Sequence, residues 1–411
     1  MSILRNKNML SLAGNLVAAG AGFLSFAILA RVLNTNMMGE WLIYLTAITF
    51  FEIIRSGLIQ TALVRFYSGS DEKSYVGSSW IISGVLTIAI LVILTIIDLI
   101  FPDLYNGLQM PFFLHQFWIY FIVTLPGGVA SWVLQAESKF TQILILRLGF
   151  AVPFLLFNIS GFYFKWTSLD ISMAQNVLYG VISLLTIIGG WTHLQSVRQI
   201  DMVRIREMLH YGKYTMGTTL ASNLLKSTDT FILGALLNPT ATAMYNLPYK
   251  LIDIIEIPLR SFAATTLPDL SKHSHEKNNK AIKEIYENRI RKLSLYLAPV
   301  SLLVLIFAEQ FVVLMGGEEY RESANILRVF CIYSLFLPAD RFIGITLDSI
   351  GQPKFNTIKV IVMVLVNGIG SYVILKVYPD PLPVAIVTVF TVLVGVGIGF
   401  AVLKKWFKEN K

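Results

Sequence analysis

The chain contains few charged residues and a single cysteine. Aspartate, glutamate, lysine and arginine make up 14% of its 411 residues, whereas a soluble domain carries about 25%. This shortage argues against a protein whose whole surface is in contact with water. The one cysteine, Cys331, excludes an intramolecular disulfide. We expect no cleavable signal peptide, because the first apolar stretch is too long for one and lacks a small-residue cleavage site.

Apolar residues take the place of the missing charge. They make up 55% of the chain and form about twelve stretches of roughly 20 to 27 residues between Met9 and Leu403. A bilayer core of about 30 Å requires about 20 apolar residues per helical crossing. Because barrel strands would be about half as long, the stretches predict an all-α integral membrane protein with about 12 transmembrane helices. We place these at residues 9–33, 40–64, 76–100, 112–136, 141–164, 174–194, 211–236, 243–267, 293–316, 323–350, 355–377 and 382–403.

Lysine and arginine concentrate in alternate hinges between these stretches. The segment 268–292 is the most basic hinge, whereas the intervening hinges at 34–39, 101–111 and 237–242 contain neither residue. Since positive charge favours the cytoplasmic side, we expect both termini in the cytoplasm. The net charge of +8 is thus a topology signal, and we expect no nucleic-acid partner. We interpret 268–292 as a charged cytoplasmic loop with an amphipathic helix that lies on anionic headgroups, and a dedicated partner site is the alternative.

The two halves of the chain show a weak internal repeat. A shift of 204 residues (237 minus 33) places Leu33-Asn34 on Leu237-Asn238 and Glu52-Ile53 on Glu256-Ile257. The repeat predicts two six-helix lobes of the same polarity, at residues 1–200 and 201–411, with the charged loop in the second lobe. Secondary transporters commonly have this plan, with a cavity between the lobes near the membrane midplane.

Several short motifs resemble a known family. Ala30-Arg31-Val32-Leu33, and Asp229 followed by Phe231-Ile232-Leu233-Gly234, resemble segments of the polysaccharide-type (Wzx-like) oligosaccharide flippases of the MOP exporter superfamily, which have a MATE-like fold. The resemblance implies a flippase in the cytoplasmic (inner) membrane. It would move an undecaprenyl pyrophosphate-linked oligosaccharide from the inner to the outer leaflet by alternating access, for O-antigen, capsule or exopolysaccharide synthesis. It also implies a polymerase or glycosyltransferases of the same pathway as partners.

Ionisable residues within the predicted spans are the candidate site. A charge near the bilayer centre costs about 3 kcal/mol on insertion scales, so such residues usually face a cavity or a partner. Cations there would bind the pyrophosphate, and acids would contact sugar hydroxyls or carry a coupling proton or sodium ion. The candidate cations are Arg55, Arg260, Lys226 and Lys250. The candidate acids are Glu52, Asp229, Asp253 and Glu256.

Two alternatives to this interpretation remain open. The pairs Glu52–Arg55, Lys226–Asp229 and Glu256–Arg260 have helical i,i+3 or i,i+4 spacing, so each pair could neutralise itself and only fasten helices. The chain could also be a cation-coupled multidrug exporter of the same superfamily, with Glu52 or Asp229 as an isolated acid. The clustered bases favour an anionic substrate. We expect no enzyme, metal site or cofactor, because no phosphate-loop, triad or metal-ligand motif is present.

Overall fold

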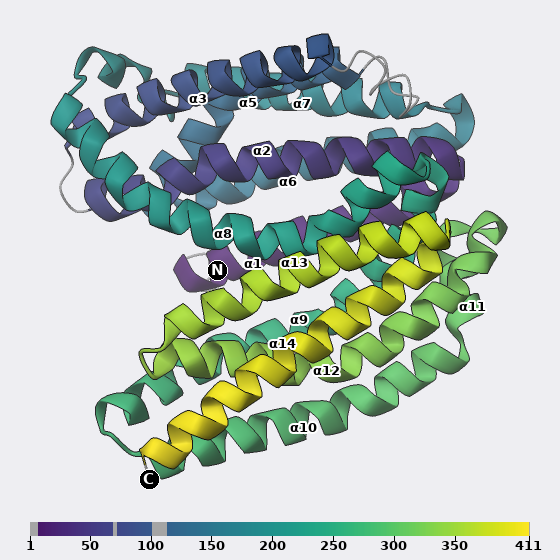
Figure 1. Ribbon diagram of the computed structural model, residues 1–411. Helices are drawn as coiled ribbons and strands as arrows, with labels where there is room; N and C mark the ends of the chain where they lie inside the picture. The colour runs from purple at the N-terminus through teal and green to yellow at the C-terminus, as the bar shows by residue number, and fades with distance from the viewer. Residues whose placement is uncertain (1–6, 69–71, 101–112, 411) are drawn as a thin grey trace. The chain divides into compact units, whose positions relative to one another are not determined.

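The computed structural model describes residues 7–68, 72–100 and 113–410, and all regular secondary structure in these ranges is helical (Figure 1). The helices of the first part of the chain are α1 (Lys7–Val32), α2 (Thr35–Tyr67), α3 (Lys73–Ile100), α5 (Phe113–Ala136), α6 (Phe140–Phe164), α7 (Ser168–Ile188) and the 3₁₀ helix η2 (Leu194–Arg198). They are followed by α8 (Met202–Leu236), α9 (Pro239–His275), α10 (Asn279–Ile306), α11 (Ala308–Gly316), η3 (Glu318–Ser323), α12 (Ala324–Ser349), α13 (Pro353–Val377) and α14 (Pro381–Glu409).

Most of these helices have the length and composition of membrane spans. Seven of them, among the described residues, are long and apolar enough to cross a bilayer, and the bent pair α10–α11 gives an eighth crossing if counted as one span. Helices α8 and α9 have 35 and 37 residues, which is also long enough. They are not apolar enough because they carry the charged residues that the sequence singled out, such as Lys226 and Glu256.

Two segments differ in detail from the predicted spans. The predicted straight span at 293–316 is broken after Ile306, where α10 and α11 form an angle of 75°. The charged segment 268–292 is mostly helical, because α9 continues to His275 and α10 begins at Asn279. The side chain of Asn278 caps α10 by accepting the backbone N–H of Ala281 at 3.1 Å.

The chain divides into two compact units, Met1–Leu220 and Ala221–Lys411, and we call these the first and the second unit. The division falls within α8, later than the predicted boundary at residue 200. The reason is that the beginning of α8 packs on helices of the first unit. Met208 is fully buried in its core beside Ile59 and Val76. A Cβ atom on Gly212 would lie 1.9 Å from the carbonyl oxygen of Leu58.

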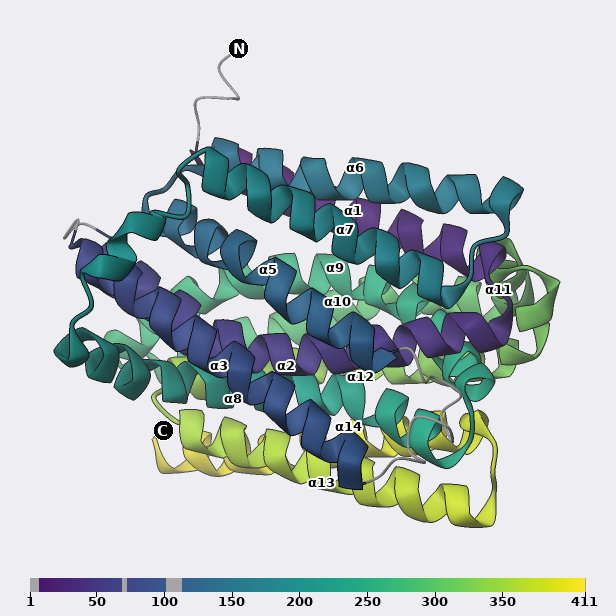
Figure 2. The ribbon, with the colours of Figure 1, turned by 90° about the horizontal axis from the view of Figure 1, so that it is seen from above.

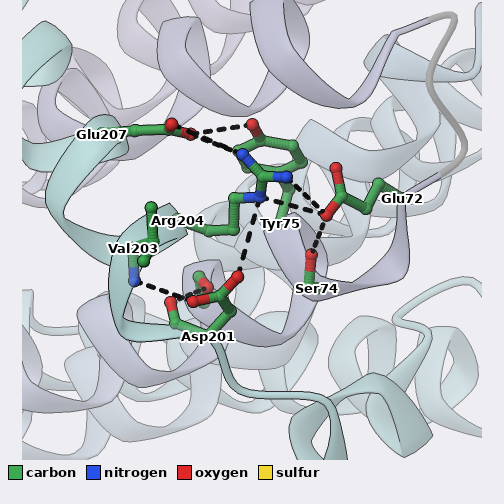
Figure 3. A network of polar contacts seen from close by, with 8 residues as sticks. Glu72, Ser74, Tyr75, Asp201, Val203, Arg204 and Glu207 are labelled. Carbon is green, nitrogen blue, oxygen red and sulfur yellow. Dashed lines mark hydrogen bonds and ion pairs between the residues drawn. The ribbon is translucent and has the colours of Figure 1, made fainter.

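Polar contacts fasten the same end of α8 (Figure 3). The guanidinium of Arg204 lies 3.0 Å from Glu72 and 3.1 Å from Glu207, and it stacks over the ring of Tyr75 at 5.1 Å. Tyr75 in turn donates to Glu207 at 2.9 Å. Hydrogen bonds to Glu207 and then to Glu72 raise the pKa of Arg204, so the guanidinium remains charged at any working pH. The beginning of α8 is therefore held to the start of α3.

Each unit has its own packing pattern. In the first unit, α1 packs on α6, and α5 packs on α7, α3 and α2. In the second unit, α12 is central and contacts α9, α10 and α14, while α13 packs on α14. Helices α13 and α14, yellow-green and yellow in Figure 2, follow each other in the chain and pack on each other. This arrangement places α8, α9, α13 and α14 where their polar residues meet inside the second unit.

Candidate coupling and substrate sites

The second unit contains a buried acid, Asp229 of α8, which is 3% exposed. Its Oδ1 accepts hydrogen bonds from Asn367 at 2.8 Å and from Ser371 at 3.0 Å, both on α13. Its Oδ2 accepts from Tyr245 of α9 at 2.5 Å and from Thr388 of α14 at 3.0 Å. Four neutral donors from three other helices thus surround one carboxylate.

Asp229 has no basic partner among the described residues of the structure. Lys226, which shares its helix, extends instead to Glu256 of α9 at 3.7 Å. The sequence-based alternative of a self-neutralising Lys226–Asp229 pair is therefore not the arrangement observed. A carboxylate buried without a countercharge is costly to keep ionised. It suits a site that gains and loses a proton or a small monovalent cation, for which oxygen atoms are the preferred ligands.

The groups around Asp229 are themselves held in place. Thr388 also lies 2.9 Å from the hydroxyl of Tyr245, and Thr391 donates to the amide oxygen of Asn367 at 3.3 Å. The ring of Tyr245 packs edge-on against Phe330 of α12 at 5.2 Å. A change in the charge state of Asp229 would therefore alter hydrogen bonds on α9, α13 and α14 together.

Two ion pairs join the other described candidate residues of α8 and α9, and in each pair the cation is the more exposed member. The side chain of Lys226 is 43% exposed and that of its partner Glu256 is 5% exposed. Lys250 pairs with Asp253 at 3.2 Å, and their side chains are 44% and 25% exposed. The acids thus lie beneath the ammonium groups, and the accessible surface of these pairs is cationic. Arg260 belongs to α9, but its side chain lies outside the described residues.

The first unit contains the other predicted pair, Glu52–Arg55, at 2.6 Å on α2. Arg55 is 1% exposed and points into the unit. It donates to the hydroxyl of Thr124 at 2.9 Å and to the backbone oxygen of Phe121 at 3.0 Å. Glu52 is the accessible member, with a side chain 27% exposed. The helix-fastening alternative describes this arrangement, and the role of Arg55 in binding substrate stays a prediction.

Sequence reasoning missed the neutral residues that surround Asp229. Asn367 and Ser371 are four residues apart on α13, so they share one face of that helix. Uncharged polar residues at this spacing in an otherwise apolar span were the available signal. The pair between Lys359 of α13 and Asp340 of α12, at 2.6 Å, was also missed, although both residues lie within predicted spans.

Residues 28–325 match a protein family described as "Polysaccharide biosynthesis protein". The "Probable low-salt glycan biosynthesis flippase Agl15" of Haloferax volcanii is 21% identical over 379 residues, which cover 91% of this chain and 78% of that protein. The "Lipopolysaccharide biosynthesis protein WzxC" of Escherichia coli is 18% identical over 369 residues, which cover 88% of this chain and 74% of that protein.

Solved structures show the same fold. An inward-facing multidrug resistance MATE family transporter of the MOP superfamily superposes with a TM-score of 0.76, at 14% identity, over 98% of this chain and 99% of its own. The lipid II flippase MurJ in an inward closed conformation superposes with a TM-score of 0.72, at 13% identity, over 96% of this chain and 87% of its own. The predicted all-α, MATE-like membrane fold is therefore confirmed.

Proposed function

Because the chain belongs to the polysaccharide biosynthesis protein family, we propose that it is a flippase for a lipid-linked oligosaccharide. The resemblance to the MOP superfamily made from short motifs is confirmed by the matched relatives and structures. The substrate we propose is an undecaprenyl pyrophosphate-linked repeat unit, moved from the inner to the outer leaflet of the cytoplasmic membrane by alternating access. Both termini would lie in the cytoplasm. Glycosyltransferases would supply the substrate, and a polymerase would consume it.

The observation that carries this proposal is the cationic surface of α8 and α9. Lys226 and Lys250 are accessible, while the acids that balance them are less exposed. A pyrophosphate with about two negative charges requires cations to replace its hydration shell when it leaves water. Glu256 and Asp253 hold the ammonium groups, which lowers the cost of charges at membrane depth. Because the ammonium groups of Lys226 and Lys250 are partly exposed, a phosphate can bind them without a rearrangement that first uncovers them.

Asp229 is the residue for which we propose energy coupling. Its four neutral donors come from α9, α13 and α14, so protonation or sodium binding at its carboxylate would change contacts between α8 and three other helices. This couples an ion gradient to the packing of the second unit. No cofactor is needed in this scheme. The proton and the sodium ion remain alternative coupling ions, and sodium dependence of transport at fixed pH separates them.

A second candidate function is cation-coupled drug export. The same isolated acid, Asp229, and the superposition on a MATE transporter favour it. The two functions differ in what the accessible lysines would do, because cationic drugs would be repelled by Lys226 and Lys250. The exposed ammonium groups therefore favour the flippase.

Reconstituted vesicles provide the test. The purified chain is incorporated together with an undecaprenyl pyrophosphate-linked oligosaccharide, and an impermeant glycosidase measures how much substrate changes leaflet. Replacing Lys226 and Lys250 with glutamine is expected to slow translocation about tenfold or more, because two charge-assisted contacts to phosphate are lost. The matched variant with arginine at both positions retains the charge and is expected to remain active.

Two results would count against the proposal. The first is substrate translocation at the wild-type rate by the glutamine variant. The second is export of a cationic dye from the same vesicles in the absence of any movement of the lipid-linked oligosaccharide, which would favour drug export instead.

A further inference from the structure

The beginning of α10 and the end of α14 meet at one end of the second unit, beside the C-terminus in Figure 1. The side-chain amide of Asn279 donates to the backbone oxygen of Asn410 at 2.7 Å. The rings of Tyr286 and Phe407 lie 6.4 Å apart. Tyr286 is 5% exposed and Ile282 is fully buried. The apolar side of this part of α10 is therefore covered, so it is not a free amphipathic surface for inserting into lipid.

The exposed side chains at this end of the two helices are mainly basic. The exposed acids here are Glu284, Glu287 and Glu409, and the last two lie 3.7 Å from Lys283 and 3.8 Å from Lys405. Among the described residues, most of the other bases here make no ion pair. The exposed bases at this end of the two helices are Lys280, Lys283, Arg291, Lys292, Lys404, Lys405 and Lys408.

Both helices change from exposed bases to exposed apolar side chains at the same level. On α10 the change follows Lys292, since Leu295 is 72% exposed and Tyr296 is 68% exposed. On α14 it lies between Phe400, which is 54% exposed, and Lys404. Tyr286 and Phe407 lie side by side, so they define a common level on the two helices. Position 293 follows Tyr286 by seven residues and position 400 precedes Phe407 by seven, so these two positions also lie at one level.

The coincidence of these two changes marks the boundary between hydrocarbon and headgroups. Helix α10 has 28 residues and is about 42 Å long, which exceeds a hydrocarbon core of about 30 Å. Its first turns must therefore extend into the headgroup layer. Arg291, Lys292, Lys404 and Lys405 lie within about one helical turn, roughly 5 Å, of the boundary. This is the depth of lipid phosphates.

We propose that Arg291, Lys292, Lys404 and Lys405 form a binding surface for the phosphate of an anionic phospholipid. Arginine and lysine at this depth attract anionic headgroups, and two helices that meet at one level can contact a single headgroup from both sides. An acidic peptide is a less suitable ligand, because the surrounding lipid headgroups already lie at the depth of these four bases. The proposal requires only that the chain spans the membrane, and it is independent of the transported substrate.

The test uses the purified full-length chain in a neutral detergent. Phosphatidylglycerol or phosphatidylcholine with identical acyl chains is titrated in, and bound lipid is counted by native mass spectrometry while thermal unfolding is followed. We expect phosphatidylglycerol to bind about tenfold more tightly than phosphatidylcholine. Glutamine at the four proposed positions is expected to remove this preference, and about 0.5 M salt is expected to weaken it in the wild-type chain.

A charge-matched control removes four exposed bases elsewhere. Glutamine replaces Lys73, Lys165, Arg198 and Arg206, which are exposed in the structure and belong to the first unit, outside α10 and α14. This variant is expected to keep the preference within about twofold. If the test variant does not fold, two smaller variants replace it. The first exchanges Arg291 for lysine and Lys292 for arginine, and the second has glutamine at Lys404 and Lys405 only. Only the second variant should bind phosphatidylglycerol more weakly.

Three results would overturn the proposal. Equal binding of both lipids by the wild-type chain would remove its basis. Equal losses in the test and control variants would show a general effect of net charge. Full competition by inorganic phosphate at the same concentration would show a generic anion site instead of a lipid surface.

Discussion

Two buried charges, Arg55 of the first unit and Asp229 of the second, have different kinds of partner. In the first unit, Arg55 is fully enclosed, but its terminal nitrogens contact an acid three residues away and three uncharged acceptors. In the second unit, Asp229 is enclosed with neutral donors alone. A compensated pair can remain in one state permanently, whereas an uncompensated acid gains stability by binding a cation. We therefore expect a fixed charge centre at Arg55 and a switchable one at Asp229.

The internal repeat makes this contrast sharper. Glu52 and Glu256 occupy equivalent positions under the shift of 204 residues (256 minus 52). Glu52 pairs with Arg55 on its own helix, whereas Glu256 reaches Lys226 on a neighbouring helix. Equivalent positions in the two halves therefore have different partners, and the half with Glu256 presents the accessible lysines.

Replacing Asp229 with Asn should have the largest effect. Asparagine has nearly the same shape but cannot take up a proton or balance a sodium ion, so we expect transport in reconstituted vesicles to fall to background. Monodisperse elution in size-exclusion chromatography is expected to be retained, because most of the surrounding donors can still be satisfied. Ion-dependent transport at the wild-type level would show that coupling occurs elsewhere.

Replacing Arg55 with Ala should reduce stability rather than a transport step alone. The change leaves Glu52 without its partner and orphans the acceptors on α3 and α5, so we expect a loss of about 3–5 kcal/mol. Thermal unfolding in detergent measures this. A double variant with Gln at position 52 as well should recover part of the loss. Normal stability together with lost translocation would instead favour the predicted substrate-binding role of Arg55.

Replacing Gly212 with Ala tests whether the start of α8 belongs to the first unit. A Cβ atom there would lie 1.9 Å from the backbone oxygen of Leu58, so α2 and α8 must move apart. We expect a loss of about 1–3 kcal/mol in thermal unfolding. Gly217, on the same helix, has no atom within 4 Å of such a Cβ and is the matched control. Alanine there should stabilise the helix by about 0.5–1 kcal/mol. Equal behaviour of the two variants would contradict the packing described.

Replacing Tyr245 with Phe should have the smallest effect. It removes one of four donors to Asp229 and leaves the ring packing on Phe330 intact. We expect a cost of about 1 kcal/mol and a severalfold change in the ion concentration that gives half-maximal transport. Tyr249 is the control, since its ring lies 6.4 Å from Tyr245 and it is not one of the donors to Asp229. An identical change in both variants would argue against a specific role of the Tyr245 hydroxyl.

The fold could be predicted further than the site. Whether a segment can cross the membrane is a local property of the sequence, because the thickness of the bilayer sets the length and apolarity it needs. The all-α membrane fold could therefore be predicted, and the superposed structures confirm it. The break after Ile306 could not be predicted, because α10 has no proline or glycine there. The end of the first unit at Leu220 depends on a close contact between two distant helices, which hydropathy does not contain.

The sequence by itself identified which charges lie within the predicted spans, since their positions can be counted. Only the tertiary structure decided their partners. Helical spacing offered Lys226 to Asp229, but side-chain packing turned it to Glu256. The donors that surround Asp229 on α13 and α14 are 138 to 159 residues away along the chain. Hydrogen bonds over such separations depend on how helices pack, and a one-dimensional pattern carries no information on that packing.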